Sequence, residues 1–283
     1  MGARLGQHFL FDPSILSRIA DASVGGPHET VLEIGPGKGT LTRALAERAA
    51  RVVAIEADRR LAAALAASCA PNVEVVTGDA LEVPWPATDA VCGNIPYQIT
   101  SPLIERALAL VTRRAALDTS DAPPAGSGLG AGATTPPRPA RVVFLVQREV
   151  ADRLAAAPGG RTWGALSAGV QLVATVERLF RVPAGAFRPR PRVDSALVRL
   201  VPRAVPLAAD AEEERRVRRL IHAAFQRRRQ QLARTLRERW GVERAEATDV
   251  LAALGAGPDV RVEALAPAQL VALARALGPR LRS

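Results

Sequence analysis

The chain has 283 residues, and its 48% hydrophobic content is enough to form one sizeable α/β domain and a smaller one. Its two cysteines, Cys69 and Cys92, are too few for a disulfide framework or a zinc site, which indicates a reducing compartment. No apolar run reaches membrane length and no signal peptide opens the chain, so we expect a cytoplasmic protein. The net charge of +10 indicates a polyanionic partner, either nucleic acid or a lipid surface.

Short apolar segments alternate with helical stretches through the first two thirds of the chain. The predicted strands are residues 30–34, 52–55, 73–76, 90–92, 141–146 and 193–201. This alternation is typical of a parallel sheet with crossover helices, whose ligands bind beyond the carboxyl ends of the strands. We therefore predict an α/β fold with its binding site at that edge.

The remaining sequence is helical, apart from one insertion. Residues from about 117 to 139 are rich in Pro, Gly, Ala, Ser and Thr and have almost no charge, which predicts a flexible surface insertion. After Pro202 the apolar spacing predicts helices. These helices span residues 212–240, 245–254 and 267–277. We place the domain boundary near residue 205, giving domains 1–204 and 205–283.

A glycine-rich turn, Gly35-Pro36-Gly37-Lys38-Gly39, follows the first of these strands. Glycines allow a backbone to approach a ligand closely, although a tight turn without a ligand also explains them. The third glycine comes one residue too early for a dinucleotide fingerprint. The preceding Glu33 would disfavour a pyrophosphate but would favour the ammonium and sulfonium groups of S-adenosylmethionine.

Two further acids follow the next strands. Glu56 stands about twenty residues after the glycines, where an acid can accept both ribose hydroxyls of a nucleotide, and Asp79 can accept an adenine amino group. Either acid alone is more often a solvated or capping residue. Four polar side chains at successive strand ends, however, indicate one shared crevice. They are Glu33, Glu56, Asp79 and Asn94.

The tetrapeptide Asn94-Ile95-Pro96-Tyr97 follows the fourth strand. An amino group on an aromatic ring is a poor nucleophile because its lone pair is delocalised, so a transferase must hold it with acceptors. The Asn94 carbonyl and a backbone carbonyl beside Pro96 can be those acceptors, with Tyr97 as a stacking platform. The alternative is an ordinary strand-to-loop turn with a packed tyrosine.

Two features indicate nucleic acid. Ten arginines and a single acid, Glu238, lie between Arg215 and Arg239, whereas a solvated helix face normally mixes signs, so we predict phosphate binding there. Phe187 lies among charged residues and prolines and is a candidate for base stacking, which contributes about 1 to 3 kcal/mol per base. The alternative for Phe187 is a core side chain beneath a proline-rich loop.

The chain resembles the ribosomal RNA adenine N6,N6-dimethyltransferases over nearly its whole length. The motifs that carry the resemblance are residues 5–10 (LGQHFL), the glycine turn, residues 94–97 (NIPY), 144–150 (FLVQREV), 187–195 (FRPRPRVDS), 224–229 (AFQRRR) and 261–265 (RVEAL). The resemblance implies a Rossmann-like class I S-adenosylmethionine-dependent methyltransferase domain, 1–204, followed by a small α-helical rRNA-binding domain, 205–283.

The resemblance also implies roles for individual residues. Cofactor contacts are expected from His8, Leu10, Gly35, Glu56, Asp79 and Asn94. Catalytic positions are Asn94, Pro96, Tyr97 and Phe187, with Tyr97 and Phe187 on the two faces of a flipped adenine. RNA contacts are expected from Arg227, Arg228 and Arg229. His8 stands where the family often has asparagine, and the arginine-rich segment also departs from the usual family sequence.

The implied activity is methyl transfer from S-adenosylmethionine to N6 of two adjacent adenosines near the 3′ end of 16S rRNA. The expected partner is the 30S ribosomal subunit during its biogenesis, and the expected enzyme is a monomer that needs no metal. Three alternatives are weighed against it: a large-subunit rRNA adenine methyltransferase of the macrolide-resistance type, a non-catalytic RNA-binding assembly factor, and a protein glutamine methyltransferase. Residues 261–265 argue against the large-subunit enzyme, and the intact glycine turn and NIPY motif argue against the assembly factor. The basic tail argues against the protein glutamine methyltransferase.

Overall fold

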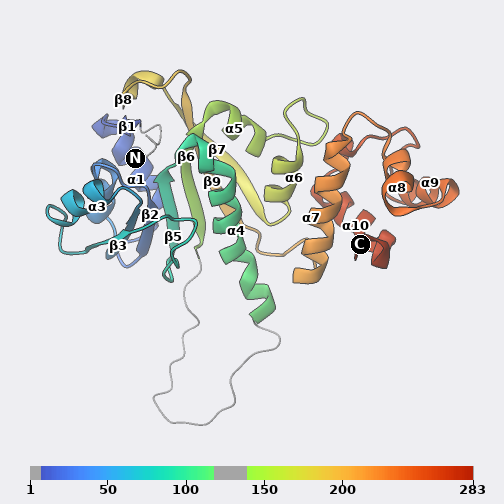
Figure 1. Cartoon of the computed structure of the whole chain (residues 1–283), viewed down its shortest axis with the longest axis horizontal. Coiled ribbons are helices and arrows are strands. Elements are labelled where there is room, and N and C mark those ends of the chain that lie inside the picture. The colour runs from blue at the N-terminus through green and yellow to red at the C-terminus, as the bar shows by residue number, and fades with distance from the viewer. Residues whose placement is uncertain (1–7, 118–138, 283) are drawn as a thin grey trace, which may run out of the picture. The chain divides into compact units, whose positions relative to one another are not determined.

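The computed structural model describes residues 8–117 and 139–282, and these form two compact units (Figure 1). Among the described residues, the first unit comprises 8–111, 139–151 and 176–202, and the second comprises 112–117, 152–175 and 203–282. Residues 118–138 of the predicted insertion lie outside the described residues. The predicted division into domains 1–204 and 205–283 stays a prediction.

A seven-stranded sheet forms the centre of the first unit, in the order β4-β3-β2-β5-β6-β9-β7. The first five strands in this order run parallel, and β9 pairs antiparallel with β6. The strands are β2 (Thr30–Ile34), β3 (Arg51–Glu56), β4 (Val73–Thr77), β5 (Ala90–Asn94), β6 (Arg141–Gln147), β7 (Ala174–Val182) and β9 (Ser195–Pro202). Two more strands, β1 (Phe9–Leu10) and β8 (Phe187–Arg188), form a separate antiparallel pair.

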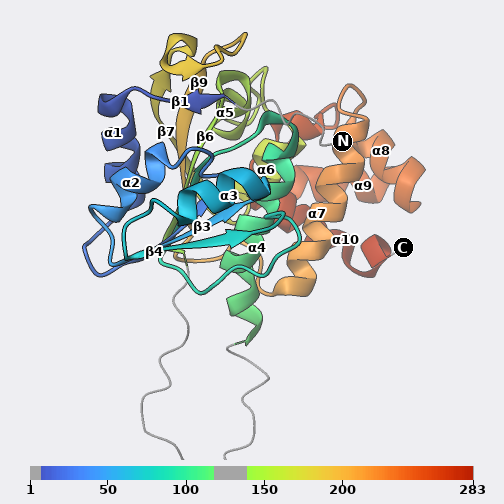
Figure 2. The same ribbon diagram turned by 60° about the vertical axis from the view of Figure 1, so that its left-hand side comes forward.

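Both faces of the central strands are buried because helices cover them. On β2, for example, Val31 belongs to a core cluster with side chains from α1 (Pro13–Ser23) and α2 (Thr40–Ala46), whereas the equally buried Leu32 does not. Successive strand residues point to opposite faces, so burial of both requires cover on each side. Helix α3 (Arg59–Ala66) lies over β3 and β4 (Figure 2).

Further helices complete the two units. They are the 3₁₀ turn η1 (Tyr97–Ile99), α4 (Thr100–Leu117), α5 (Arg148–Leu154), α6 (Ala165–Gln171), the 3₁₀ turn η2 (Ala184–Ala186), α7 (Ala211–Gln226), α8 (Leu232–Trp240), α9 (Arg244–Ala253), the 3₁₀ turn η3 (Val262–Ala264), α10 (Pro267–Leu277) and the 3₁₀ turn η4 (Gly278–Arg282). In the helical unit, α7 packs against α6 and α10, with Val217, Leu220 and Ile221 in its core.

The predicted α/β fold and its six predicted strands are confirmed, but the predicted helix over 212–240 is wrong. The predicted helix over 212–240 is two helices, because the chain turns at residues 227–231, where the Leu232 N–H donates to the Val260 carbonyl instead of continuing the helix. The strand predicted at 193–201 is β9, which begins at Ser195 and ends at Pro202. Strand β7 was not predicted. Among the described residues, no helix is long and apolar enough to cross a membrane.

Candidate functional site

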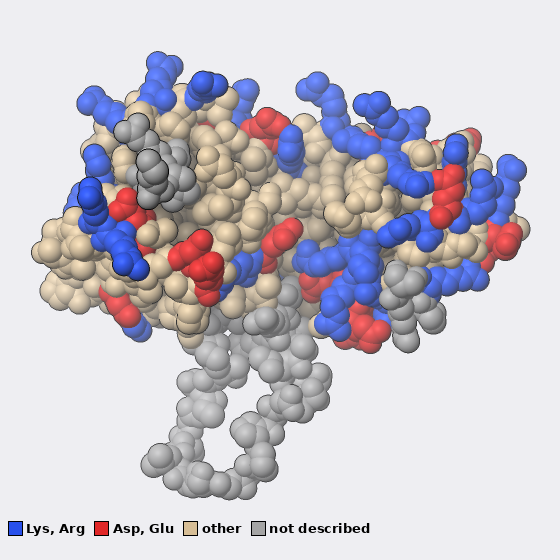
Figure 3. Space-filling model, in the orientation of Figure 1, with Lys and Arg blue, Asp and Glu red and all other residues tan. Residues whose placement is uncertain are grey.

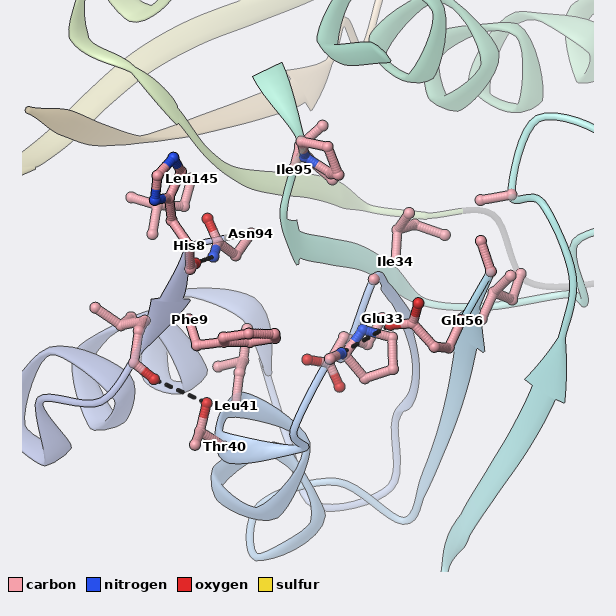
Figure 4. Close-up of a pocket in the computed structure, with 18 of the residues that line it drawn as sticks. His8, Phe9, Glu33, Ile34, Thr40, Leu41, Glu56, Asn94, Ile95 and Leu145 are labelled. Atoms are coloured by element: carbon pink, nitrogen blue, oxygen red, sulfur yellow. Dashed lines mark hydrogen bonds between the residues drawn. The ribbon is translucent and has the colours of Figure 1, made fainter. Parts of the chain in front are cut away.

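One cavity lies in the first unit, where β2, β3, β4 and β5 end, and all the predicted cofactor residues line it (Figure 4). Pro96 and Tyr97 also line it. The predicted site residues that line the cavity are therefore His8, Leu10, Gly35, Glu56, Asp79, Asn94, Pro96 and Tyr97. The parallel strands bring these side chains together, and their individual roles stay predictions.

The glycine turn lines the cavity, and its backbone has a conformation that residues with a side chain rarely adopt. Gly35 has a φ of +69°, and Gly37 has a φ of +57°. A Cβ atom on Gly37 would lie 2.8 Å from the ring of Phe9, which also lines the cavity. The glycines therefore allow the backbone to lie against β1 and leave the cavity open to a ligand.

Glu56 ends β3 and is only 4% exposed. Its Oε2 accepts a hydrogen bond of 2.9 Å from the Gly37 N–H, and its Oε1 accepts one of 2.9 Å from the Asp58 N–H. Asp58 in turn caps the N-terminus of α3. These bonds fix the carboxylate against the glycine turn, so its remaining lone pairs are held ready for two donors from a ligand.

Glu33 lies in the same cavity and is 1% exposed, yet one of its carboxylate oxygens has no hydrogen-bond partner. Burial raises the pKa of Glu33 from its ordinary value of 4.5 to about 7, the Thr42 hydroxyl opposes this, and the neighbouring Glu56 charge adds to it. A buried carboxylate oxygen without a hydrogen-bond partner is costly, and a cationic ligand group would remove that cost. This orphan oxygen fits the ammonium of S-adenosylmethionine.

Asp79 lies in the loop that follows β4, and its Oδ1 accepts a hydrogen bond of 2.8 Å from the Leu81 N–H. Arg106 of α4 holds the same loop, because its guanidinium donates to the carbonyls of Leu81 and Val83. The guanidinium also lies 5.1 Å from the ring centre of Trp85. This contact could not be predicted from the sequence, since the hydrogen-bond partners of Arg106 are main-chain atoms.

Asn94 is the last residue of β5 and is fixed by the N-terminal segment. Its Nδ2 donates a hydrogen bond of 2.8 Å to the His8 carbonyl, which leaves the side-chain oxygen as an acceptor (Figure 4). The Tyr97 ring lies 5.9 Å from the His8 ring, and its hydroxyl lies 3.3 Å from the Ser195 hydroxyl. The tetrapeptide is thus held from both sides.

Phe187 does not line the cavity in this structure. Its side chain is 2% exposed and belongs to the core cluster, next to Leu10 across the β1–β8 pair. Stacking of a base on Phe187 would therefore require this side chain to leave the core. Its place in the catalytic set stays a prediction, and the buried position matches the core alternative weighed for it.

The three arginines predicted to bind RNA lie at the turn between α7 and α8, and two of them have acidic partners. Arg227 pairs with Glu238, and Arg228 pairs with Glu263 at 2.8 Å. Arg229 is exposed and has no acid within reach among the described residues. Figure 3 shows Lys and Arg side chains gathered over α7 and α8.

Half of the ten arginines between Arg215 and Arg239 take part in ion pairs, a fact that the composition of this segment alone hides. The paired ones are Arg216, Arg218, Arg227, Arg228 and Arg234. The other five face solvent without an acidic partner among the described residues. They are Arg215, Arg219, Arg229, Arg237 and Arg239. In the part of the chain that the structure describes, no cluster of three metal-binding side chains occurs.

Solved structures with the same fold identify the class. The chain is similar to a dimethyladenosine transferase from Plasmodium falciparum, with a TM-score of 0.72 and 25% identity over 94% of this chain and 96% of that one. It is also similar to the 23S rRNA methyltransferase ErmE, with a TM-score of 0.69 and 30% identity over 95% and 99% of the two chains. The fold and the cavity define a class I methyltransferase.

The sequence places the chain within that class. It belongs to the ribosomal RNA adenine dimethylase family, whose model matches residues 2–277. A protein from Nitratidesulfovibrio vulgaris named ribosomal RNA small subunit methyltransferase A is 38% identical, over 96% of this chain and 95% of its own. A protein of the same name from Geobacter metallireducens is 37% identical, over 96% and 94%.

Proposed function

We propose that this chain transfers methyl groups from S-adenosylmethionine to N6 of two adjacent adenosines near the 3′ end of 16S rRNA, giving N6,N6-dimethyladenosine. The observation that carries the proposal is the joint position of Glu33, Glu56, Asp79 and Asn94 around one cavity, in a chain that belongs to the rRNA adenine dimethylase family. The 30S subunit as substrate, the cytoplasmic location and the monomeric state belong to the same proposal.

The residues of the cavity fit the cofactor, which supplies an electrophilic methyl group on a sulfonium. Glu56 would accept from the two ribose hydroxyls, since its orientation is already fixed by Gly37 and Asp58. Glu33 would meet the ammonium with its free oxygen, and Asp79 would accept from the adenine amino group. Because its glycines have no side chains, the glycine turn leaves room for the cofactor beside it.

The tetrapeptide would hold the target amino group. The Pro96 carbonyl already accepts a hydrogen bond of 3.1 Å from the Ile99 N–H, whereas no hydrogen bond among the described residues reaches the Ile95 carbonyl. The Asn94 side-chain oxygen and the Ile95 carbonyl are therefore the two acceptors for the N6 protons. These contacts localise the nitrogen lone pair, and the rate gain comes from orientation and electrostatics without a general base.

The other candidate functions have less support. The similarity to ErmE keeps a large-subunit rRNA methyltransferase as the second candidate, but the relatives at 36% to 38% identity carry the small-subunit name. An assembly factor without activity would not need the preset Glu56 and Asn94 contacts. A protein glutamine methyltransferase would not need the basic helical unit.

One experiment separates these functions. The purified chain is supplied with radiolabelled S-adenosylmethionine and, in parallel, with unmethylated 30S particles, free 16S rRNA and 50S particles, and the modified nucleotides are mapped. We expect label at two adjacent adenosines near the 3′ end of 16S rRNA. Label in 50S particles would favour the ErmE-like activity, and absence of label in every RNA would overturn the proposal.

A further inference from the structure

We propose that the segment Arg188-Pro189-Arg190-Pro191-Arg192, together with Phe11, binds the single-stranded RNA that flanks the target adenosine. We call these residues the arginine–proline segment. The inference rests on the proposed function, because it concerns how the same cavity receives its RNA. It differs from the helical arginines in assigning an RNA contact to the catalytic unit itself.

The arginine–proline segment is attached directly to the rim of the cavity. Strand β8 pairs with β1 so that Arg188 lies opposite Phe9, which lines the cavity. The Phe11 N–H donates to the Ala186 carbonyl at 3.2 Å, and the His8 Nδ1 lies 2.7 Å from the Pro189 carbonyl oxygen. His8 also lines the cavity, and its backbone carbonyl accepts a hydrogen bond from the side-chain amide of Asn94. An RNA strand entering at this rim would therefore meet the segment.

The charges of the segment are not neutralised within the protein. Arg188, Arg190 and Arg192 are exposed, and no acid among the described residues pairs with them. The adjacent acid, Asp194, is already engaged: its Oδ2 accepts from Arg181 Nε at 2.9 Å, and its Oδ1 accepts from the Ala184 N–H at 2.9 Å. The hydrogen bond from the Ala184 N–H and the one from Arg181 hold the pKa of Asp194 below its ordinary value.

Several other arginines of the catalytic unit are neutralised by acidic partners. Arg48, Arg51, Arg141 and Arg199 each form an ion pair with a glutamate or aspartate. Arg188, Arg190 and Arg192 differ from these four in having no acidic partner among the described residues. Figure 3 shows blue side chains at the upper edge where β8 lies in Figure 1. Such a cluster attracts a polyanion.

Aromatic side chains accompany the cations. Phe11 is 43% exposed, and the Arg188 guanidinium lies 4.8 Å from the centre of its ring. Lys38 lies 4.9 Å from the ring centre of Phe9 in the same way. Cations that neutralise phosphates next to aromatic faces that stack on bases are the combination found in sites for single-stranded nucleic acid.

The prolines favour RNA binding because they restrict the backbone of the arginine–proline segment before RNA binds. Pro189 and Pro191 each have a fixed φ, and Pro191 is buried. Arg190 between the two prolines, and Arg188 and Arg192 beside them, thus start from a restricted backbone, so less entropy is lost when they engage phosphates. The sequence identified this motif, but no role for its arginines followed from the sequence.

The test compares three triple variants. The first changes Arg188, Arg190 and Arg192 to Gln, and the second changes the same three to Lys. The matched control changes Arg51, Arg178 and Arg199 to Gln, which removes the same net charge from the catalytic unit outside the cavity lining. Binding of a labelled single-stranded RNA containing two adjacent adenosines is measured by fluorescence anisotropy across a salt series.

We expect the first variant to bind this RNA at least about tenfold more weakly at low salt and to lose about 0.7 in salt slope per lost phosphate contact. The Lys variant and the control should keep most of the affinity. In methylation of 30S particles, the first variant should raise KM and leave kcat nearly unchanged. Cofactor affinity and the thermal unfolding midpoint check that the variant is folded.

Equal RNA affinity for the first variant and the control at every salt concentration would overturn the inference. Absence of measurable RNA binding by the unchanged chain would overturn it as well. A chain that binds RNA through the arginine–proline segment but does not methylate 30S particles would instead refute the proposed function and leave the inference standing. The two failures are therefore distinguishable.

Discussion

The side-chain amide of Asn94 donates a hydrogen bond of 2.8 Å to the backbone carbonyl of His8, 86 positions earlier in the chain. This bond settles which end of the amide remains free. With its nitrogen engaged, Asn94 presents its oxygen as an acceptor, and the Ile95 N–H is fixed by the Leu145 carbonyl at 3.2 Å. The end of β5 is thus preorganised before any target base arrives.

The first prediction is that Asn94→Ala lowers kcat for 30S methylation by roughly two to three orders of magnitude, because one directed acceptor for the amino group is lost. Cofactor affinity, measured by calorimetry, should fall much less, because Glu33 and Glu56 remain in place. A variant with near-normal kcat would remove Asn94 from the catalytic set.

The second prediction concerns Glu33 and the pH dependence of cofactor binding. Because burial raises its pKa to about 7, the free site is largely protonated below pH 7 and charged above it. The cationic cofactor prefers the charged form, so its Kd should fall as the pH rises from 6 to 8 and then level off. Glu33→Gln should weaken binding and flatten this profile, measured by calorimetry at several pH values.

The same pKa shift has an opposite effect on folding. The folded state keeps the Glu33 proton up to about pH 7, whereas the unfolded chain releases it near 4.5, so stability falls as the pH rises through this window. Without cofactor, Glu33→Gln should therefore unfold at a higher temperature than the unchanged chain at pH 8. Equal thermal midpoints at pH 8 would show that the buried carboxylate has no such cost.

The third prediction is that Glu56→Gln raises the Kd for S-adenosylmethionine at least about tenfold, since charge-assisted hydrogen bonds contribute about 1.5 to 3 kcal/mol. Gln is chosen because its oxygen can still accept from Gly37 or Asp58, which limits the structural damage. Glu82→Gln, an exposed change outside the cavity lining, is the control. An unchanged Kd would place the ribose elsewhere.

The cavity residues were predictable from sequence because each lies at, or just after, the carboxyl end of a predicted strand, and parallel strands end at one edge of a sheet. Glu33, Glu56, Asp79 and Asn94 all lie there. The pairing of β1 with β8 was not predictable, since two-residue strands carry no periodicity. It brings His8 next to Pro189 and buries Phe187, whose proline-rich neighbours had suggested exposure.

The arginine-rich region shows a second limit of sequence reasoning. A count of charges between Arg215 and Arg239 overlooks acids outside that window, and Glu212, Glu214 and Glu263 each pair with an arginine inside it. The first two pairs follow from helical spacing of four residues and could have been predicted. The Arg228 to Glu263 pair joins positions 35 apart and required the structure.

The fourth prediction is that Arg106→Leu weakens cofactor binding although Arg106 does not line the cavity. Its guanidinium holds the Leu81 and Val83 carbonyls, and the loop that they belong to carries Asp79. Loss of both bonds should loosen the loop and raise the Kd for S-adenosylmethionine several-fold. Arg106→Lys should recover part of the affinity, and Asp79→Asn combined with Arg106→Leu should show no further loss if both act through the same loop.

The last prediction separates the three arginines at the turn between α7 and α8. Arg229 has no acidic partner among the described residues, so Arg229→Glu should weaken binding to 30S particles and lower the salt slope by about 0.7 to 0.9, with little change in thermal stability. Arg228→Glu would instead place a carboxylate against Glu263 and should lower the unfolding midpoint of the helical unit. If Arg229→Glu binds normally at every salt concentration, the turn makes no phosphate contact through this residue. A loss of binding confined to Arg228→Glu would then reflect damage to the fold and not the loss of an RNA contact.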